Sequence, residues 1–113
     1  MDEFLRTDHV LNEVRSERQR QDRLKASGKF LWTCADNEAL RNKLERAITN
    51  AEKLAVLAEE FGEAACEVTE EIIGRDRGDV THADKSVERL RKELVQVAAV
   101  CVAWVEAIDK RAE

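Results

Sequence analysis

Proline is missing from this chain of 113 residues, and glycine, at four, is scarce. Tyrosine is also absent, and the only aromatic residues are two tryptophans and three phenylalanines. With 43% hydrophobic and 38% charged residues, the composition is typical of an all-α protein with solvated outer faces, and no sheet is expected. The length fits one domain, residues 1–113, of a size that often associates with further copies to bury more surface.

Other absences disfavour whole classes of function. The net charge of -5 argues against a protein that holds nucleic acid by its phosphate backbone. The three cysteines form no CxxC pair and have no neighbouring histidines, which disfavours a zinc site and a disulfide framework. The first residues do not resemble a signal peptide, and no apolar run reaches the roughly 20 residues that span a bilayer. We therefore expect a soluble, cytoplasmic protein with reduced cysteines and without nucleic-acid or membrane partners.

Hydrophobic periodicity and capping residues predict three helices, at about 2–24, 37–73 and 83–110. Asp36 is the expected cap of the second helix, and Thr49 with Asn50 marks a candidate break inside it. The residues from Gly74 to Gly78 are expected to form a turn, after which Thr81 or Asp84 caps the last helix.

The last helix contains a segment, residues 94–105, that is apolar everywhere except at Gln96. Such a segment is expected to be buried on every side, with Trp104 in the core and part of its surface covered by another subunit. Cys101 in this helix and Cys66 in the preceding one are expected to be small core residues, whereas Cys34 lies in a loop and is expected to be more exposed.

Between Leu54 and Ile73 the chain has six glutamates and no lysine or arginine. Like charges three and four residues apart on a helix repel one another, so a partner from outside the segment is expected. Apolar residues in the same segment recur at three and four and predict a stripe that faces the core: Leu57, Phe61, Ala65, Val68 and Ile72. The helical turn places three of the acids on a band beside that stripe: Glu60, Glu63 and Glu67.

Gly62 lies in the middle of this acidic helix. Glycine inside a helix is less favourable than alanine by about 1 kcal/mol. A close approach by another helix or by a ligand would explain it.

Two pairs of oxygen-bearing side chains, Glu60 with Glu63 and Glu93 with Gln96, each have i, i+3 spacing. Antiparallel packing of their helices would bring the four side chains face to face. Mg²⁺ takes oxygen ligands, with Mn²⁺ as an alternative, and a bound ion would recruit phosphate. In the other interpretation the acids form a solvated face, and Glu93 pairs with Lys92 or Arg89.

The segments LAEEFGE (57–63) and LRKELVQV (90–97) resemble MazG-like members of the all-α nucleoside triphosphate pyrophosphohydrolases, whose pattern is EExxE, then ExxD before a hydrophobic helix. The resemblance covers residues 54–100. It implies a helical bundle, dimeric or tetrameric, that uses magnesium to hydrolyse nucleoside triphosphates to monophosphate and pyrophosphate.

The resemblance also assigns roles to particular residues. Glu60, Glu63 and Glu93 match the metal ligands, and Glu59 matches the additional acid of the first motif. Gln96 stands where the family pattern has aspartate, so its neutral carbonyl replaces a carboxylate and metal affinity should fall. A spare carboxylate, from Glu59, Glu63 or Glu67, would be the general base.

Substrate contacts are assigned less directly. Trp32, with Phe30 and Asn37 nearby, is a candidate for stacking on a base, and a place in the core is its alternative role. Four cations are candidates for phosphate contacts or, alternatively, are solvated: Lys53, Arg75, Arg77 and Lys92. Because Gln96 stands where the family pattern has aspartate, the alternative function is a nucleotide-binding or helical protein-interaction module without hydrolysis.

Overall fold

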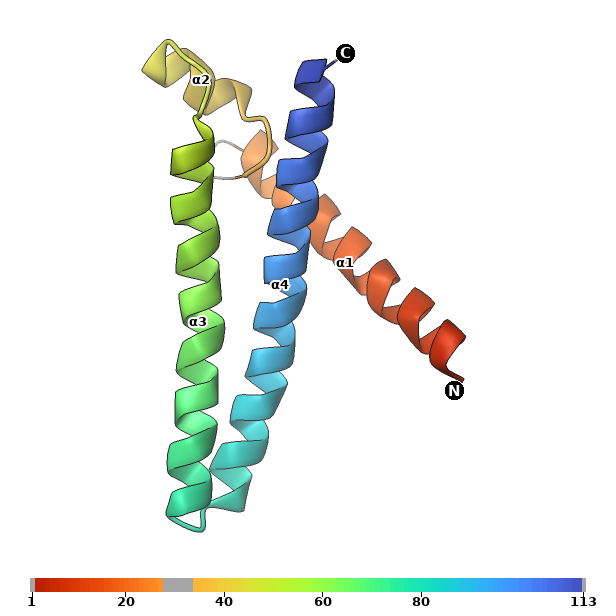
Figure 1. The fold of residues 1–113 in the computed structure, drawn as a ribbon, viewed down its shortest axis with the longest axis vertical. Helices are drawn as coiled ribbons and strands as arrows, with labels where there is room; N and C mark the ends of the chain where they lie inside the picture. The colour runs from red at the N-terminus through yellow and green to blue at the C-terminus, as the bar shows by residue number, and fades with distance from the viewer. Residues whose placement is uncertain (1, 28–33, 113) are drawn as a thin grey trace.

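The computed structural model describes residues 2–27 and 34–112, which contain four helices and no strand. They are α1 (Glu3–Ala26), α2 (Glu38–Leu44), α3 (Asn50–Asp76) and α4 (Val80–Ala112). The two long helices, α3 and α4, form an antiparallel hairpin, and α1 crosses α4 obliquely (Figure 1). The all-α fold class is confirmed.

The predicted helix at 37–73 is divided into α2 and α3. Glu45 ends α2 in the left-handed conformation, with φ 57°. Thr49 then begins α3 with a capping box, in which the Thr49 hydroxyl accepts from the Glu52 amide at 3.1 Å and the Glu52 carboxylate accepts from the Thr49 amide at 3.0 Å. The break lies where Thr49 predicted it.

The turn between α3 and α4 is shorter than expected. α3 continues through Gly74, where an added Cβ would lie 3.0 Å from the Ala83 backbone nitrogen, so any larger residue would crowd this close approach of the two helices. Gly78 makes the turn with φ +72°. Asp79, and neither Thr81 nor Asp84, accepts a hydrogen bond from the His82 amide (3.0 Å) in the first turn of α4.

The seam between α3 and α4 follows residues at seven-residue intervals, which are buried or half-buried. On α3 these residues are Lys53, Glu60, Glu67 and Gly74, and on α4 they are Ser86, Glu93, Val100 and Ala107. Alanines also enter the seam, among them Ala64 and Ala83, and their small side chains let the helices lie close together. Several carboxylates therefore stand at a helix–helix contact.

The apolar stripe predicted for α3 does not face the core. Phe61 is 63% exposed, and Ala65, Val68 and Ile72 are also exposed, whereas Leu57 is half-buried. The prediction was wrong because the stripe lies beside the seam, turned away from α4. Periodicity located an apolar face correctly but could not say whether this chain covers it.

The segment 94–105 of α4 is buried only on part of its circumference. Ala99, Val100 and Ala103 are buried, whereas Leu94 is 50% exposed and Val105 is also exposed. The expectation of burial on every side was therefore wrong for the single chain, because three other helices do not surround α4. Trp104 is half-buried at the seam, and its indole N–H donates to the Asn50 side-chain oxygen at 3.0 Å.

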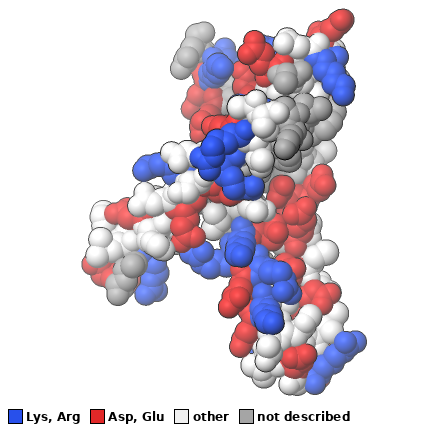
Figure 2. All heavy atoms as spheres, turned by 180° about the vertical axis from the view of Figure 1, so that it is seen from behind, with Lys and Arg blue, Asp and Glu red and all other residues white. Residues whose placement is uncertain are grey.

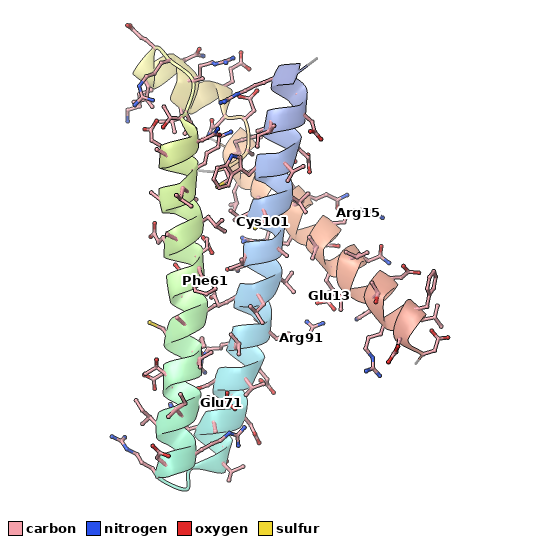
Figure 3. All side chains as sticks on the ribbon, viewed as in Figure 1. Glu13, Arg15, Phe61, Glu71, Arg91 and Cys101 are labelled. Atoms are coloured by element: carbon pink, nitrogen blue, oxygen red, sulfur yellow. The ribbon has the colours of Figure 1, made fainter. Side chains whose placement is uncertain are left out.

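Ion pairs attach α1 to α4. The buried Arg18 guanidinium lies between Asp22 of α1 and Glu106 of α4, at 3.0 and 3.4 Å. Glu13 and Arg91 point toward each other (Figure 3) and pair through two hydrogen bonds of 2.6 and 2.7 Å. These contacts fix which face of α1 meets the hairpin.

The cysteines differ from expectation. Cys34 is 1% exposed, and its thiol donates to the Lys53 carbonyl at 3.1 Å. Burial raises the pKa of this thiol to about 11. Cys66 and Cys101, expected in the core, are exposed because each lies on a helix face that points away from the seam. Over residues 2–27 and 34–112, none of the helices has the length and apolar character needed to cross a bilayer.

Candidate metal centre

Three carboxylates from both helices of the hairpin converge at one place. Glu60 and Glu63 lie one turn apart on α3, and Glu93 lies on α4, with one oxygen of each side chain within 4.8 Å of the others. Glu60 and Glu93 are half-buried because they occupy seam positions, whereas Glu63 is exposed at the edge. The i, i+3 spacing and antiparallel packing bring these three predicted ligands together. We call Glu60, Glu63 and Glu93 the carboxylate cluster.

The electrostatics of the carboxylate cluster disfavour its full ionisation. Burial, followed by the charges of Glu63 and Glu59, raises the pKa of Glu60 above its ordinary value. The pKa of Glu93 is raised as well, first by burial and next by the neighbouring Glu63. Oε2 of Glu93 is buried and has no hydrogen-bond partner among the described residues. An uncompensated acceptor of this kind is destabilising, and a cation would relieve it.

Three other glutamates of α3, nearer the turn, do have partners. Glu67 accepts from Arg89 at 2.7 Å, Glu70 lies 3.0 Å from the His82 ring, and Glu71 pairs with Arg75 at 2.8 Å. Within the described residues, neither Arg89 nor Lys92 forms an ion pair with Glu93, contrary to the solvated-face interpretation. Among the glutamates of α3, those without an ion pair to a described residue are Glu59, Glu60 and Glu63, at or beside the carboxylate cluster.

A cavity of about 220 Å³ adjoins the carboxylate cluster, between α1 and the hairpin. Glu60 and Gln96 both line it, so the fourth predicted ligand lies in the same cavity as a member of the cluster. Apolar side chains form much of the remaining wall: Leu24, Cys34, Val56, Val100 and Ala103. At this volume the cavity fits part of a ligand, since pockets for whole drug-sized ligands measure about 300–1,000 Å³.

Helix α1 contributes residues that the sequence interpretation missed. Glu17, Arg20 and Gln21 also line the cavity. Arg20 donates two hydrogen bonds to Glu17, of 2.6 and 2.8 Å, and its positive charge acts on Glu60. Together with Leu24 these residues recur at three and four along α1, which is the signal that could have identified the face. Seen from behind (Figure 2), acidic and basic side chains are mixed over α1 and the adjoining hairpin.

Other predicted site residues are not brought to the carboxylate cluster. Glu59 is exposed beside it on α3, and Lys92 is exposed on α4. Lys53 is only 1% exposed, and burial lowers its pKa, so the prediction that it contacts phosphate was wrong. Asn37 is buried and accepts from the Leu40 amide as the cap of α2. Trp32, like its neighbour Phe30, lies outside the described residues.

The donor set of the carboxylate cluster fits a hard divalent cation. Mg²⁺ prefers carboxylate and carbonyl oxygens at about 2.1 Å and retains several waters, so three oxygens within 4.8 Å can reach one ion by small side-chain rotations. The exposed edge at Glu63 leaves room for water and for a phosphate ligand. The buried Glu93 oxygen, for which the described part of the chain offers no hydrogen-bond partner, is the observation that most favours a cation over a simple solvated cluster.

Comparison with known proteins adds no assignment. No protein-family model matches the chain, and neither the curated proteins nor the solved structures gave a match. The MazG-like resemblance stays a prediction that rests on the two acidic motifs.

Proposed function

We propose that this protein is a magnesium-dependent nucleoside triphosphate pyrophosphohydrolase of the MazG-like type, which releases monophosphate and pyrophosphate. The observation that carries the proposal is the convergence of Glu60, Glu63 and Glu93, with a buried Glu93 oxygen that no described residue hydrogen-bonds. A triphosphate is highly anionic, so an acidic site attracts it only through a cation.

Each site residue has a role in this proposal. Glu60, Glu63 and Glu93 hold Mg²⁺ or Mn²⁺, and Gln96 adds its carbonyl oxygen. When bound, the ion neutralises phosphate charge and lowers the pKa of a water. Glu59 or Glu63, both exposed at the edge, accepts the proton of the attacking water.

The cavity beside the carboxylate cluster suits the organic end of such a substrate. Its apolar wall would pack against a base, while Gln21 and Gln96 offer amide groups for hydrogen bonds. Arg20 stands at the same cavity, paired with Glu17, and can exchange this partner for a phosphate. Lys92, exposed next to Glu93 in sequence, remains a proposed phosphate contact.

The decisive assay measures pyrophosphate release from a panel of ribo- and deoxyribonucleoside triphosphates with Mg²⁺ or Mn²⁺. Glu63→Gln should abolish turnover, and Glu88→Gln, an exposed glutamate of α4, is the matched control that should leave it unchanged. The proposal fails if no triphosphate is hydrolysed, or if Glu63→Gln is as active as wild type.

One observation favours a second candidate function, a nucleotide-binding or protein-interaction module without hydrolysis. Gln96 supplies one charge fewer than the aspartate of the family pattern. Calorimetry separates the cases: triphosphate binding without turnover would indicate a sensor, and binding of neither Mg²⁺ nor triphosphate would indicate a helical assembly protein.

The proposal includes a cytoplasmic location and a homodimer or homotetramer. Exposed free thiols at Cys66 and Cys101 suit a reducing compartment. Exposed apolar side chains on both α3 and α4 support self-association.

A further inference from the structure

Helix α1 is attached to the rest of the molecule over only half of its length. Its first part projects away from the hairpin (Figure 1), and residues 2–12 are all exposed. α1 packs against α4, whereas no described Cα atom of α1 lies within 8 Å of α2 or α3. Of its 24 residues only Val14 and Arg18 are buried, and Val14 alone of these is apolar. The apolar contribution to the docking of α1 is therefore small.

Ion pairs make the main specific contacts between α1 and α4. Two hydrogen bonds of 2.6 and 2.7 Å join Glu13 to Arg91, and Arg18 reaches Glu106 at 3.4 Å. The side chains of Arg91 and Glu106 are both more than half exposed. Ion pairs at the surface are weak and are screened by salt. α1 is therefore held by contacts that water and dissolved ions can replace.

α1 also carries ion pairs of its own, which do not depend on α4. Arg18 pairs with Asp22 at 3.0 Å, and Arg20 pairs with Glu17 at 2.6 Å, in both cases within one helical turn. The Asp2 side chain caps the first turn of the helix. If α1 leaves α4, the Arg18 guanidinium keeps a carboxylate partner, so undocking does not leave its charge uncompensated. α1 can therefore move as one unit.

The cavity beside the carboxylate cluster is closed on one side by α1. Four residues of α1 form this wall: Glu17, Arg20, Gln21 and Leu24. Glu60 and Gln96 belong to the opposite wall, on the hairpin. The cavity measures about 220 Å³, whereas pockets that enclose a whole drug-sized ligand measure about 300–1,000 Å³. To hold both the base and the sugar of a nucleotide, the wall formed by α1 has to move outward.

We propose that α1 is a lid, which opens the cavity when its two ion pairs with α4 break and closes again when a ligand fills the cavity. Arg20 stands on the lid, and Gln96 stands on the hairpin. A triphosphate that contacts both binds the closed form more tightly than the open form, so it favours closure. Closure on a triphosphate rests on the proposed function, whereas the attachment of the lid by ion pairs does not.

Pulsed electron paramagnetic resonance between spin labels on α1 and α3 tests the lid in the full chain. Arg15→Cys, at an exposed position of α1, and the exposed native Cys66 take the labels, Cys101→Ser removes the other exposed thiol, and Cys34 is buried. An excess of unlabelled chain removes distances between copies. A short distance should predominate at low salt, and a longer one should gain population as salt is added. Arg91→Glu should raise the ratio of long to short distances by roughly tenfold, because it opposes two like charges.

Arg75→Glu is the matched control and should leave the distances unchanged, because Arg75 pairs with Glu71 inside α3. Exchanging the charges, with Glu13→Arg added to Arg91→Glu, should restore the short distance. A distribution that neither salt nor Arg91→Glu changes would overturn the lid.

A nonhydrolysable triphosphate with Mg²⁺ should raise the population of the short distance in wild type. If Arg91→Glu opens the lid but the triphosphate changes nothing, the attachment by ion pairs is supported and closure on a triphosphate is overturned. That outcome would identify the proposed function as the part that failed.

Discussion

The two sides of α3 differ in what they present. Toward α1 the helix carries Glu59, Glu60 and Glu63, whereas the exposed side with Leu54, Phe61 and Val68 carries only uncharged side chains between residues 51 and 72. Each side exposes an unmet requirement in the single chain. On the first side, Glu93 adds a buried oxygen that has no partner among the described residues, and on the second side Phe61 is 63% exposed. The difference indicates what each side requires, which is a cation on one and an apolar surface on the other.

Replacing Glu93 by glutamine should have the largest effect and should be confined to the acidic side. Turnover is expected to fall by roughly 100-fold or more, and the rise in Tm that Mg²⁺ produces should disappear. The metal-free variant should melt higher than metal-free wild type, since a neutral amide relieves the repulsion from Glu63. Calorimetric melting with and without Mg²⁺, together with sedimentation, checks this. An effect on assembly of the same size would contradict the separation of the two sides.

Phe61→Glu tests the opposite side. Dimers should be lost, yet each isolated chain should bind Mg²⁺ as tightly as wild type does, since the carboxylate cluster belongs to one hairpin. Isothermal titration with Mg²⁺ at concentrations where the variant is monomeric gives the answer. Loss of metal binding together with the dimer would show that the partner copy completes the site.

Gln96→Asp should change the acidic side in the opposite direction from Glu93→Gln. A fourth carboxylate beside Glu60 is expected to tighten Mg²⁺ binding by roughly tenfold and to lower the Tm of the metal-free protein. Isothermal titration of wild type and of Gln96→Asp with Mg²⁺, at the same ionic strength, measures the difference in affinity. Unchanged affinity would place Gln96 outside the ligand set.

Glu52→Ala should have the smallest effect and should spare both sides. Glu52 accepts from Arg46 and from the Thr49 amide, and these hydrogen bonds lower its pKa to about 2. Because the folded pKa lies below the unfolded value of 4.5, its contribution is fully present above pH 4.5 and is lost as the pH falls toward 2. The variant should melt a few degrees lower at neutral pH, and the difference should shrink in acid, as melting curves at several pH values would show.

Much of the fold could be predicted from sequence because helix signals are local. Composition gave the all-α class, and Thr49 marked the break before α3. The grouping of Glu60, Glu63 and Glu93 followed from i, i+3 spacing and antiparallel packing. The spacing of residues along one helix is a local property, so it predicts the helix and its faces whatever the tertiary arrangement is.

The wrong predictions concern which neighbour covers a face. Phe61 and Leu94 are apolar, yet this chain leaves them exposed, and Cys34 is buried although it precedes α2 in a loop. Arg20 and Glu17 were missed because their three-and-four spacing marks only a face of α1, whereas what that face meets depends on how α1 crosses α4. Tertiary placement decided each of these outcomes.

The close turn at Gly74 and Gly78 sets the alignment of the whole hairpin. Residues equally far along the chain from Gly78 face one another, as Glu67 faces Arg89 and Glu63 faces Glu93. One residue inserted into either helix would rotate everything beyond it by about 100° and separate the acids. Two whole turns added to both helices would instead lengthen the spacer without disturbing the site. Distance from the turn, more than spacer length, is therefore the quantity by which distant relatives of this chain should be aligned.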